Sequence, residues 1–148
     1  MKKIFGVLIA VLALTFSTLA CASDAEKIQV VSAWKNQRGS TLYIDNIEPT
    51  GQLYGRFINR APGFRCQNIP YPVVGWVYGT AITFTVIWKG IESCNSITAW
   101  TGFVHQGKMQ TLWQLVSSGS TNTSQIMQGA DTFTPVTFHG YKSLQLEK

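Results

Sequence analysis

The sequence predicts an all-β fold, and three features of the chain after about Val30 support this prediction. Short runs of β-branched and aromatic residues recur, separated by Gly, Pro, Asn and Ser. No segment there has the 3.6-residue period of an amphipathic helix. The runs follow one another through mostly hairpin-like connections, without internal repeats. Together these features favour a sandwich or a closed antiparallel barrel.

Eight strands are expected from these runs. In chain order they cover residues 30–36, 40–46, 52–59, 72–78, 81–89, 96–104, 109–117 and 130–136. The fifth has the clearest period of two, because Thr83 and Thr85 alternate with an apolar face that ends at Trp88. The longest connection, residues 60–71, carries Cys66, and long connections of this kind are often functional.

A period of two also assigns the side chains that share a face with an aromatic residue in each strand. In chain order this face holds Trp34 and Asn36; Ser40, Leu42 and Ile44; Gly55, Phe57 and Asn59; Trp88; Ser96, Thr98, Trp100 and Gly102; Thr111, Trp113 and Leu115; Asp131 and Phe133. We expect Trp34 and Trp76 to be ordinary core residues instead of ligand contacts.

The polar members of this face are unusual for a packed core. Burying such a group without a partner costs about 1–3 kcal/mol, so these groups either pair with one another or contact a ligand. An eight-stranded barrel is just wide enough for one small ligand. Asp131 is the only ionisable group on the face, which favours a neutral group with both hydrogen-bond donors and acceptors.

The first 22 residues have the pattern of a secretory signal peptide. Lys2 and Lys3 precede an apolar run, and Ala20 and Ala22 form a small-residue cleavage site. A lipoprotein acylated at Cys21 and a membrane anchor are the alternatives, and the run is short for a span of about 20 residues. We therefore expect a secreted or periplasmic protein, not held in a membrane, with an extension at 23–29, a barrel at 30–136 and a tail at 137–148.

Charge and composition argue against two other functional classes. Removal of Lys2 and Lys3 lowers the net charge from +5 to +3, and the remaining basic residues are scattered, so we expect no nucleic-acid partner. Seven acidic residues and two histidines without paired carboxylates or a G-x-S-x-G motif predict that the protein is not an enzyme. No Cys or acidic residue lies near either His, so neither a metal site nor a cofactor is expected.

The mature chain would keep two cysteines, Cys66 and Cys94. An even pair in an exported protein indicates a disulfide, and a metal site is the weaker alternative. Positions 66 to 94 would close a loop of 29 residues. In the chain-entropy model such a loop stabilises the fold by about 3–4 kcal/mol.

Five motifs resemble the avidin–streptavidin family, in order, over about residues 34–134. They are WKNQRGS, VIWKG, NSITAWTG, TLWQL and GADTFT. The resemblance implies an eight-stranded antiparallel up-and-down β-barrel that binds one biotin tightly and without catalysis. It implies that Asn36 and Ser40 donate to the ureido oxygen and that Asp131 and Asn59 accept from the ureido N–H groups. It also implies that Trp88, Trp100 and Trp113 wall the bicyclic ring, with Thr98 near the sulfur. Ser96 would lie near the carboxylate, and the segment from Ala61 to Cys66 would contact the ligand tail.

Two positions depart from the family pattern. Phe57 stands where the family usually has a Tyr that also donates to the ureido oxygen, and one missing donor could weaken binding by about 1 kcal/mol or more. The stretch before Asp131 has no Trp to lend to a neighbouring subunit. In this respect, and in the Cys66–Cys94 pair and the sequence RCQNIPYP, the chain resembles the dimeric, disulfide-containing bacterial avidins. This resemblance implies a homodimer.

Three alternative functions remain open at this point. The barrel could bind another small polar ligand, or bind biotin only weakly because of Phe57. It could carry apolar ligands as lipocalins do, although the polar groups of the shared face do not suit that role. A periplasmic hydrolase would need a base or nucleophile array that the sequence does not supply.

Overall fold

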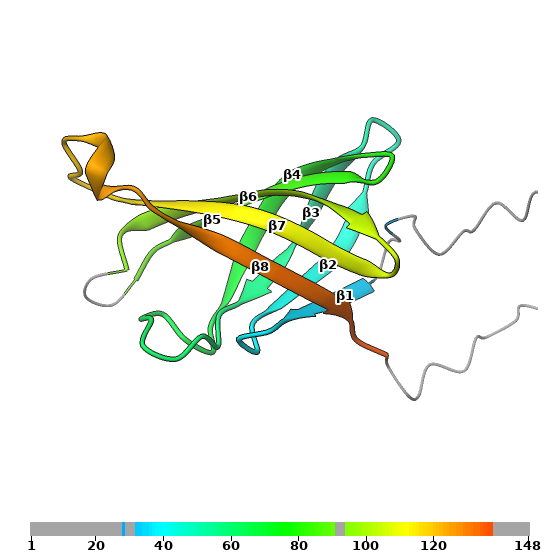
Figure 1. The fold of residues 1–148 in the computed structure, drawn as a ribbon, viewed down its shortest axis with the longest axis horizontal. Helices are drawn as coiled ribbons and strands as arrows, with labels where there is room; N and C mark the ends of the chain where they lie inside the picture. Colours follow the sequence, from blue (N-terminus) through cyan, green and yellow to red (C-terminus); the bar gives the residue numbers. More distant parts are fainter. Residues whose placement is uncertain (1–27, 29–31, 91–93, 138–148) are drawn as a thin grey trace, which may run out of the picture.

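The structure is a computed structural model that describes residues 28, 32–90 and 94–137 of the 148-residue chain. Eight strands form one closed antiparallel barrel (Figure 1). Each strand pairs with its neighbours in sequence, and the last strand pairs with the first. The prediction of an eight-stranded up-and-down barrel is therefore confirmed. The expected signal peptide, and most of the expected extension and tail, lie outside the described residues.

The strand bounds agree with the expected segments to within two residues, except at the start of the last strand. The strands are β1 (Ser32–Asn36), β2 (Thr41–Ile47), β3 (Gln52–Ile58), β4 (Pro70–Tyr78), β5 (Ala81–Trp88), β6 (Ser96–His105), β7 (Lys108–Ser117) and β8 (Met127–Pro135). The expected start of the last strand at residue 130 was wrong. Strand β8 begins three residues earlier because its pairing with β7 continues to the Leu115–Met127 pair.

The connection between β7 and β8 contains a 3-10 helix, η2 (Thr123–Gln125), that the sequence patterns did not predict. Asn122 caps it, since its side chain accepts a hydrogen bond from the Ser124 N–H at 3.0 Å. The Gln125 side chain accepts from the Asn122 N–H at 3.1 Å and completes a capping box. Among the described residues no helix is long and apolar enough to span a membrane.

The interior of the barrel is filled by the side chains that the period of two assigns inward. Leu42, Leu53, Phe84 and Phe133 are completely buried. Trp34 belongs to this core, as expected. Trp76 does not, because it is 53% exposed on the outer face of β4, and its assignment to the core was wrong.

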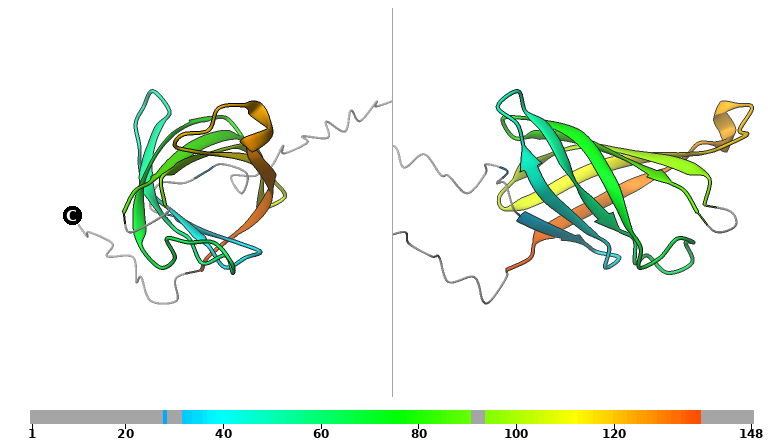
Figure 2. Two further views of the ribbon diagram at one scale, coloured as in Figure 1. Left: turned by 90° about the vertical axis from the view of Figure 1, so that its left-hand side faces the viewer. Right: turned by 180° about the vertical axis from the view of Figure 1, so that it is seen from behind.

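The up-and-down topology decides where the connections lie. The β1–β2, β3–β4, β5–β6 and β7–β8 connections gather at one end of the barrel, which faces left and down in Figure 1. The other three connections lie at the opposite end, together with the start of β1 and the end of β8. Figure 2 shows the barrel close to end-on and from behind. The residues that lead into the first group of connections thus converge on one opening.

Candidate ligand-binding site

A cavity of about 350 Å³ opens at the end of the barrel where the four connections gather. This volume lies at the lower end of the range typical of small-molecule sites. The cavity is lined by every residue that the sequence singled out as a ligand contact: Asn36, Ser40, Phe57, Asn59, Ala61, Trp88, Ser96, Thr98, Trp100, Trp113 and Asp131. The strand alternation thus brings together residues that are up to 95 positions apart in the sequence, from 36 to 131.

Asn36 ends β1 and is held in one orientation by the tight turn that follows. Its amide oxygen accepts hydrogen bonds from the Arg38 N–H at 3.1 Å and the Ser40 N–H at 2.8 Å. Because the oxygen bonds to the backbone, the Nδ2 group is the part of the amide left to serve a ligand. The turn therefore presents Asn36 to the cavity as a hydrogen-bond donor.

Ser40, just before β2, and Asn59, just after β3, bond to each other. The Ser40 hydroxyl donates to Asn59 Oδ1 at 3.2 Å and accepts from the Arg60 N–H at 2.9 Å. Asn59 Oδ1 also accepts from the Ala61 N–H at 3.0 Å, and its Nδ2 donates to the Arg65 carbonyl at 3.2 Å. The polar side chains in this part of the cavity are thus oriented by backbone groups, with Asn59 Oδ1 as an acceptor.

Asp131 lies on β8 and is 6% exposed. Trp100 Nε1 donates to its Oδ2 at 3.0 Å, and Gln37 Nε2 donates to its Oδ1 at 3.0 Å. Each carboxylate oxygen therefore has one fixed donor and keeps further lone pairs for a ligand N–H. Among the described residues that line the cavity, this is the one carboxylate.

Aromatic rings form the apolar part of the cavity wall. Phe57 stacks on Trp100 with ring centroids 5.0 Å apart, and it meets Trp88 edge-on at 5.9 Å. Trp88 Nε1 donates to Thr98 Oγ1 at 2.8 Å, so the indole N–H of this buried ring is satisfied. These contacts fix the rings before any ligand enters.

Trp113 lies on β7 directly opposite Gly129 of β8. A Cβ atom at position 129 would lie only 2.5 Å from Trp113 Cζ2. The glycine therefore leaves the space that the indole needs to lie across β8 and line the cavity.

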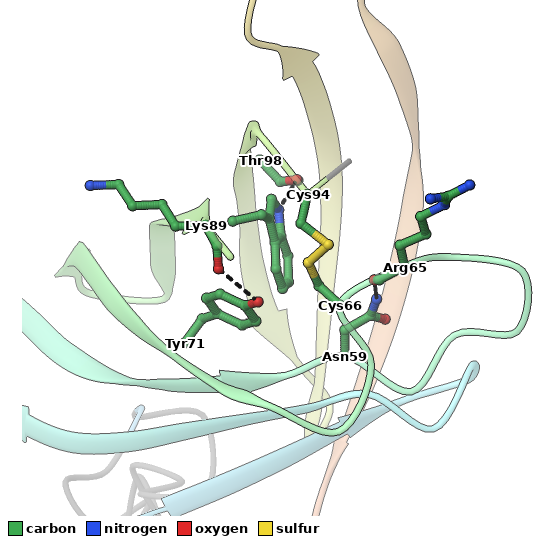
Figure 3. Close-up of a disulfide and its surroundings, with 8 residues drawn as sticks. Asn59, Arg65, Cys66, Tyr71, Lys89, Cys94 and Thr98 are labelled. Atoms are coloured by element: carbon green, nitrogen blue, oxygen red, sulfur yellow. Dashed lines mark hydrogen bonds between the residues drawn. A yellow bond between two sulfur atoms is a disulfide. The ribbon is translucent and has the colours of Figure 1, made fainter. Parts of the chain in front are cut away.

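A disulfide joins Cys66 of the β3–β4 connection to Cys94, just before β6, with 6.1 Å between the Cα atoms. The disulfide prediction is confirmed, and the metal alternative at these positions is excluded. Figure 3 shows the bridge beside Asn59 and Thr98, and both cysteines line the cavity. The bridge ties the long connection to the start of β6, while the Asn59–Arg65 bond ties it to the cavity. The expected contact of residues 61–66 with a ligand tail remains a prediction, although Phe64 and Arg65 also line the mouth.

Sequence reasoning missed several residues of the site. Gln37 is the most important of them, because its side chain also accepts from the Thr132 N–H at 2.9 Å and donates to the Ala130 carbonyl at 3.2 Å. Its place beside Asn36 in a tight turn was the available signal, but a strict period of two assigns it to the outer face. Among the residues that line the cavity itself, Arg38 and Met127 were also missed.

The chemistry of the cavity is that of a binding site for a mainly neutral, compact molecule. It offers donors from Asn36 and Ser40, acceptors from Asn59 and Asp131, and flat aromatic walls. In the described part of the chain, no three His, Cys, Asp or Glu side chains gather as metal ligands would.

Comparison with known proteins gives a consistent result. A model described as the avidin family matches residues 24–136. Afifavidin from Afifella pfennigii is 43% identical over 112 residues, which are 72% of this chain and 69% of afifavidin. A crystal structure of apo shwanavidin aligns with a TM-score of 0.72 at 55% identity, over 75% of this chain and 99% of shwanavidin. A crystal structure of a rhizavidin–biotin complex aligns with a TM-score of 0.68 at 41% identity, over 79% of this chain and 100% of rhizavidin.

Proposed function

Because the chain belongs to the avidin family, we propose that it is a non-catalytic binding protein that holds one molecule of biotin in each barrel. The single observation that carries this proposal is the cavity itself. It combines fixed donors, fixed acceptors and stacked aromatic rings around one space of about 350 Å³. The biotin complexes of rhizavidin and short afifavidin support the choice of ligand.

The polar groups would match the ureido ring of biotin group by group. Asn36 Nδ2 and the Ser40 hydroxyl would donate to the ureido oxygen, while Asp131 and Asn59 Oδ1 would each accept from one ureido N–H. Trp88, Trp100 and Trp113 would enclose the bicyclic ring, with Thr98 near the thioether sulfur and Ser96 near the carboxylate end. Residues 61–66 would contact the valeryl chain. The orientation of these groups by backbone hydrogen bonds supports tight binding, because little side-chain entropy remains to be lost.

Ligand entry would exchange hydrogen bonds without leaving a buried group unpaired. The Ser40 hydroxyl, which donates to Asn59 Oδ1, would rotate to donate to the ureido oxygen. A ureido N–H would then take its place at Asn59 Oδ1. One internal bond is thus replaced by two bonds to ligand, and Asn59 stays in position through its bonds to Ala61 and Arg65.

Phe57 makes weaker biotin binding, or binding of another small polar molecule, the second candidate. Its ring is 2% exposed and supplies no donor where the family usually has a Tyr hydroxyl. The ureido oxygen would then have two side-chain donors, Asn36 and Ser40, instead of three. The stacking of Phe57 on Trp100 still supports a ring-shaped ligand at this position.

We also infer that the protein is a homodimer that uses the outer face of β4–β7. Trp76, Ile87, Phe103 and Leu112 are 47–70% exposed on this face. Away from the strand ends, this face carries Thr, Ala and Gln besides apolar residues. His105, at the end of β6, and Lys108, at the start of β7, lie at its edge. Such an uncharged patch resembles the core of a subunit interface more than a free surface.

The outer face of β2–β3 provides the contrast. Asp45 and Arg56 form an ion pair there with an N–O distance of 2.8 Å, and this hydrogen bond lowers the pKa of Asp45. Both side chains are about half exposed, as expected for a face that stays in solvent. A second copy of the chain on the β4–β7 face would cover the apolar residues and leave this charged face free.

Light scattering on the purified protein tests the dimer. Leu112→Lys would place a charge in the patch, and we expect the mass to fall from that of two chains to that of one. Lys35→Glu, on the outer face of β1, is the control and should leave the mass unchanged. A monomeric wild type, or a dimer that survives Leu112→Lys together with Trp76→Lys, would contradict this interface.

Export completes the proposal. The amino-terminal pattern of residues 1–22 and the disulfide both suit an oxidising compartment, so the protein would act in the periplasm or outside the cell. Amino-terminal sequencing of the natural protein tests this, with Ser23 as the expected first residue. A retained Met1 would contradict it.

Equilibrium binding of radiolabelled biotin tests the function. We expect unlabelled biotin to displace the label completely, and a fatty acid such as palmitate to displace none of it. Displacement by palmitate would favour an apolar carrier. Binding that is displaced by micromolar biotin but not by nanomolar biotin would favour the weaker second candidate. Release of product from a generic ester would show an enzyme and contradict the proposal.

A further inference from the structure

The mouth of the cavity differs in charge from its interior. Two arginines, Arg38 of the β1–β2 turn and Arg65 of the β3–β4 connection, line the cavity. Asp131 is the one carboxylate among the described lining residues, and it lies deep, held by Trp100 and Gln37. The described part of the mouth therefore presents positive charge to whatever enters.

Both arginines are fixed to the groups that would bind the ligand. The Arg38 N–H donates to Asn36 Oδ1 at 3.1 Å, and the Arg65 carbonyl accepts from Asn59 Nδ2 at 3.2 Å. Figure 3 shows the second of these bonds, with the Arg65 side chain extending from the connection away from Asn59. The backbone of each arginine is thus tied to an amide side chain at the polar part of the cavity.

The Arg38 side chain is positioned further by Phe64. Its guanidinium carbon lies 6.0 Å from the Phe64 ring centroid, at the outer limit of a cation–π contact. Phe64 also lines the cavity. The contact therefore joins the β1–β2 turn to the β3–β4 connection at the mouth and keeps the Arg38 charge there.

We propose that Arg38, assisted by Arg65, makes the site selective for ligands that end in a free carboxylate over ligands whose end is a neutral amide. This inference rests on the proposed function, since it concerns the outer end of a biotin whose ureido ring occupies the interior. A carboxylate at the mouth would gain from the positive charge, whereas a carboxamide of the same shape would not. The preferred ligand is then free biotin, and biotin joined through an amide to a protein lysine binds less well.

The expected size of the preference follows from the exposure of the arginines. Exposed ion pairs are individually weak, and salt screens them over a distance of about 8 Å at physiological ionic strength. Loss of one such pair should change an affinity ratio by about two- to fivefold. The same charges should also speed the association of the anion at low salt.

Competition between biotin and biotinamide for one labelled site tests the proposal. Biotinamide replaces the carboxylate by a neutral group of the same shape. We expect wild type to prefer biotin, Arg38→Gln to reduce this ratio by about two- to fivefold, and Arg38→Gln with Arg65→Gln to reduce it further. Lys108→Gln removes the same charge at the opposite end of the barrel and should leave the ratio unchanged.

Two further measurements separate charge from structure. Arg38→Lys keeps the charge and should keep most of the preference, and raising NaCl from about 20 mM to about 500 mM should reduce the wild-type preference. A wild-type ratio that neither salt nor Arg38→Gln changes would overturn the proposal while leaving biotin binding intact. Equal loss of the preference in Arg38→Lys and Arg38→Gln would also overturn the proposal, because it would show that the charge at position 38 does not matter. If wild type binds neither compound, the proposed function fails instead.

Discussion

Gln37 Nε2 lies 3.0 Å from Asp131 Oδ1, and this hydrogen bond joins the β1–β2 turn to the last strand of the barrel. Trp100 holds the other carboxylate oxygen at 3.0 Å. The acceptor that would receive a ureido N–H is therefore clamped from two sides by residues of different strands and turns. Gln37 itself does not line the cavity, so it is a positioning residue.

Replacing Gln37 with Ala should accelerate biotin release. The change removes one donor to Asp131 and both bonds to the backbone of β8, and a hydrogen bond to a charged group contributes about 1.5–3 kcal/mol. We expect dissociation to be faster by about tenfold or more, with the association rate little changed. Gln128→Ala, on the exposed part of the same strand as Asp131, is the control. Equal dissociation rates for both variants would show that Gln37 does not position the carboxylate.

Replacing Phe57 with Tyr should strengthen biotin binding. The added hydroxyl would supply a third donor to the ureido oxygen, which is worth about 1 kcal/mol or roughly fivefold in affinity. Displacement of labelled biotin measures the change. Weaker binding by a variant with an unchanged melting temperature would mean that the Phe57 ring does not face the ureido group.

Replacing Gly129 with Ala should damage the cavity more than the fold. The new Cβ would lie 2.5 Å from Trp113 Cζ2, so the indole has to leave its place in the wall. Because Trp113 is only partly buried, it can move toward the opening at modest cost to stability. We expect a large loss of biotin affinity with a change in near-ultraviolet circular dichroism. Wild-type affinity in this variant would contradict a ligand contact for Trp113.

Replacing both Cys66 and Cys94 with Ser should lower stability and loosen ligand retention. Loss of the cross-link should reduce the free energy of unfolding by about 3–4 kcal/mol in the chain-entropy model. The same change frees the connection that carries the Asn59–Arg65 bond, so biotin should also leave faster. Denaturant unfolding and dissociation rates report the two effects separately. An unchanged dissociation rate would limit the disulfide to a role in stability.

The sequence predicts the site where alternation is unambiguous. Strands such as β5 and β6 carry Thr, Ser or Trp at regular spacing, and every side chain assigned inward from them is found on the inner side. On β4 the alternation of polar and apolar residues is lost. Val73 and Val74 are both apolar although they face opposite sides of the sheet, and so are Trp76 and Val77. Hydrophobicity alone therefore could not show that Trp76 faces outward.

Other features depend on partners that are distant in sequence. The start of β8 at Met127 is fixed by pairing with Leu115. The short stretch 127–129 has no alternating pattern that marks it as part of a strand. Gln37 lies in a turn, where continuing the period of two of β1 wrongly assigns it to the outer face. Its role appears only when β8 closes the barrel beside it. Tertiary pairing decides both, so neither followed from local pattern.

Calorimetric titration of the purified mature protein with biotin tests the central claim most directly. We predict a heat that corresponds to one site per chain, with nanomolar or tighter affinity, on a sample whose scattering mass is that of two chains. Such a result would mean that the donors and acceptors of Asn36, Ser40, Asn59 and Asp131 suffice without a Tyr at position 57. Absence of any heat at millimolar biotin, from a protein that still melts cooperatively, would contradict the account.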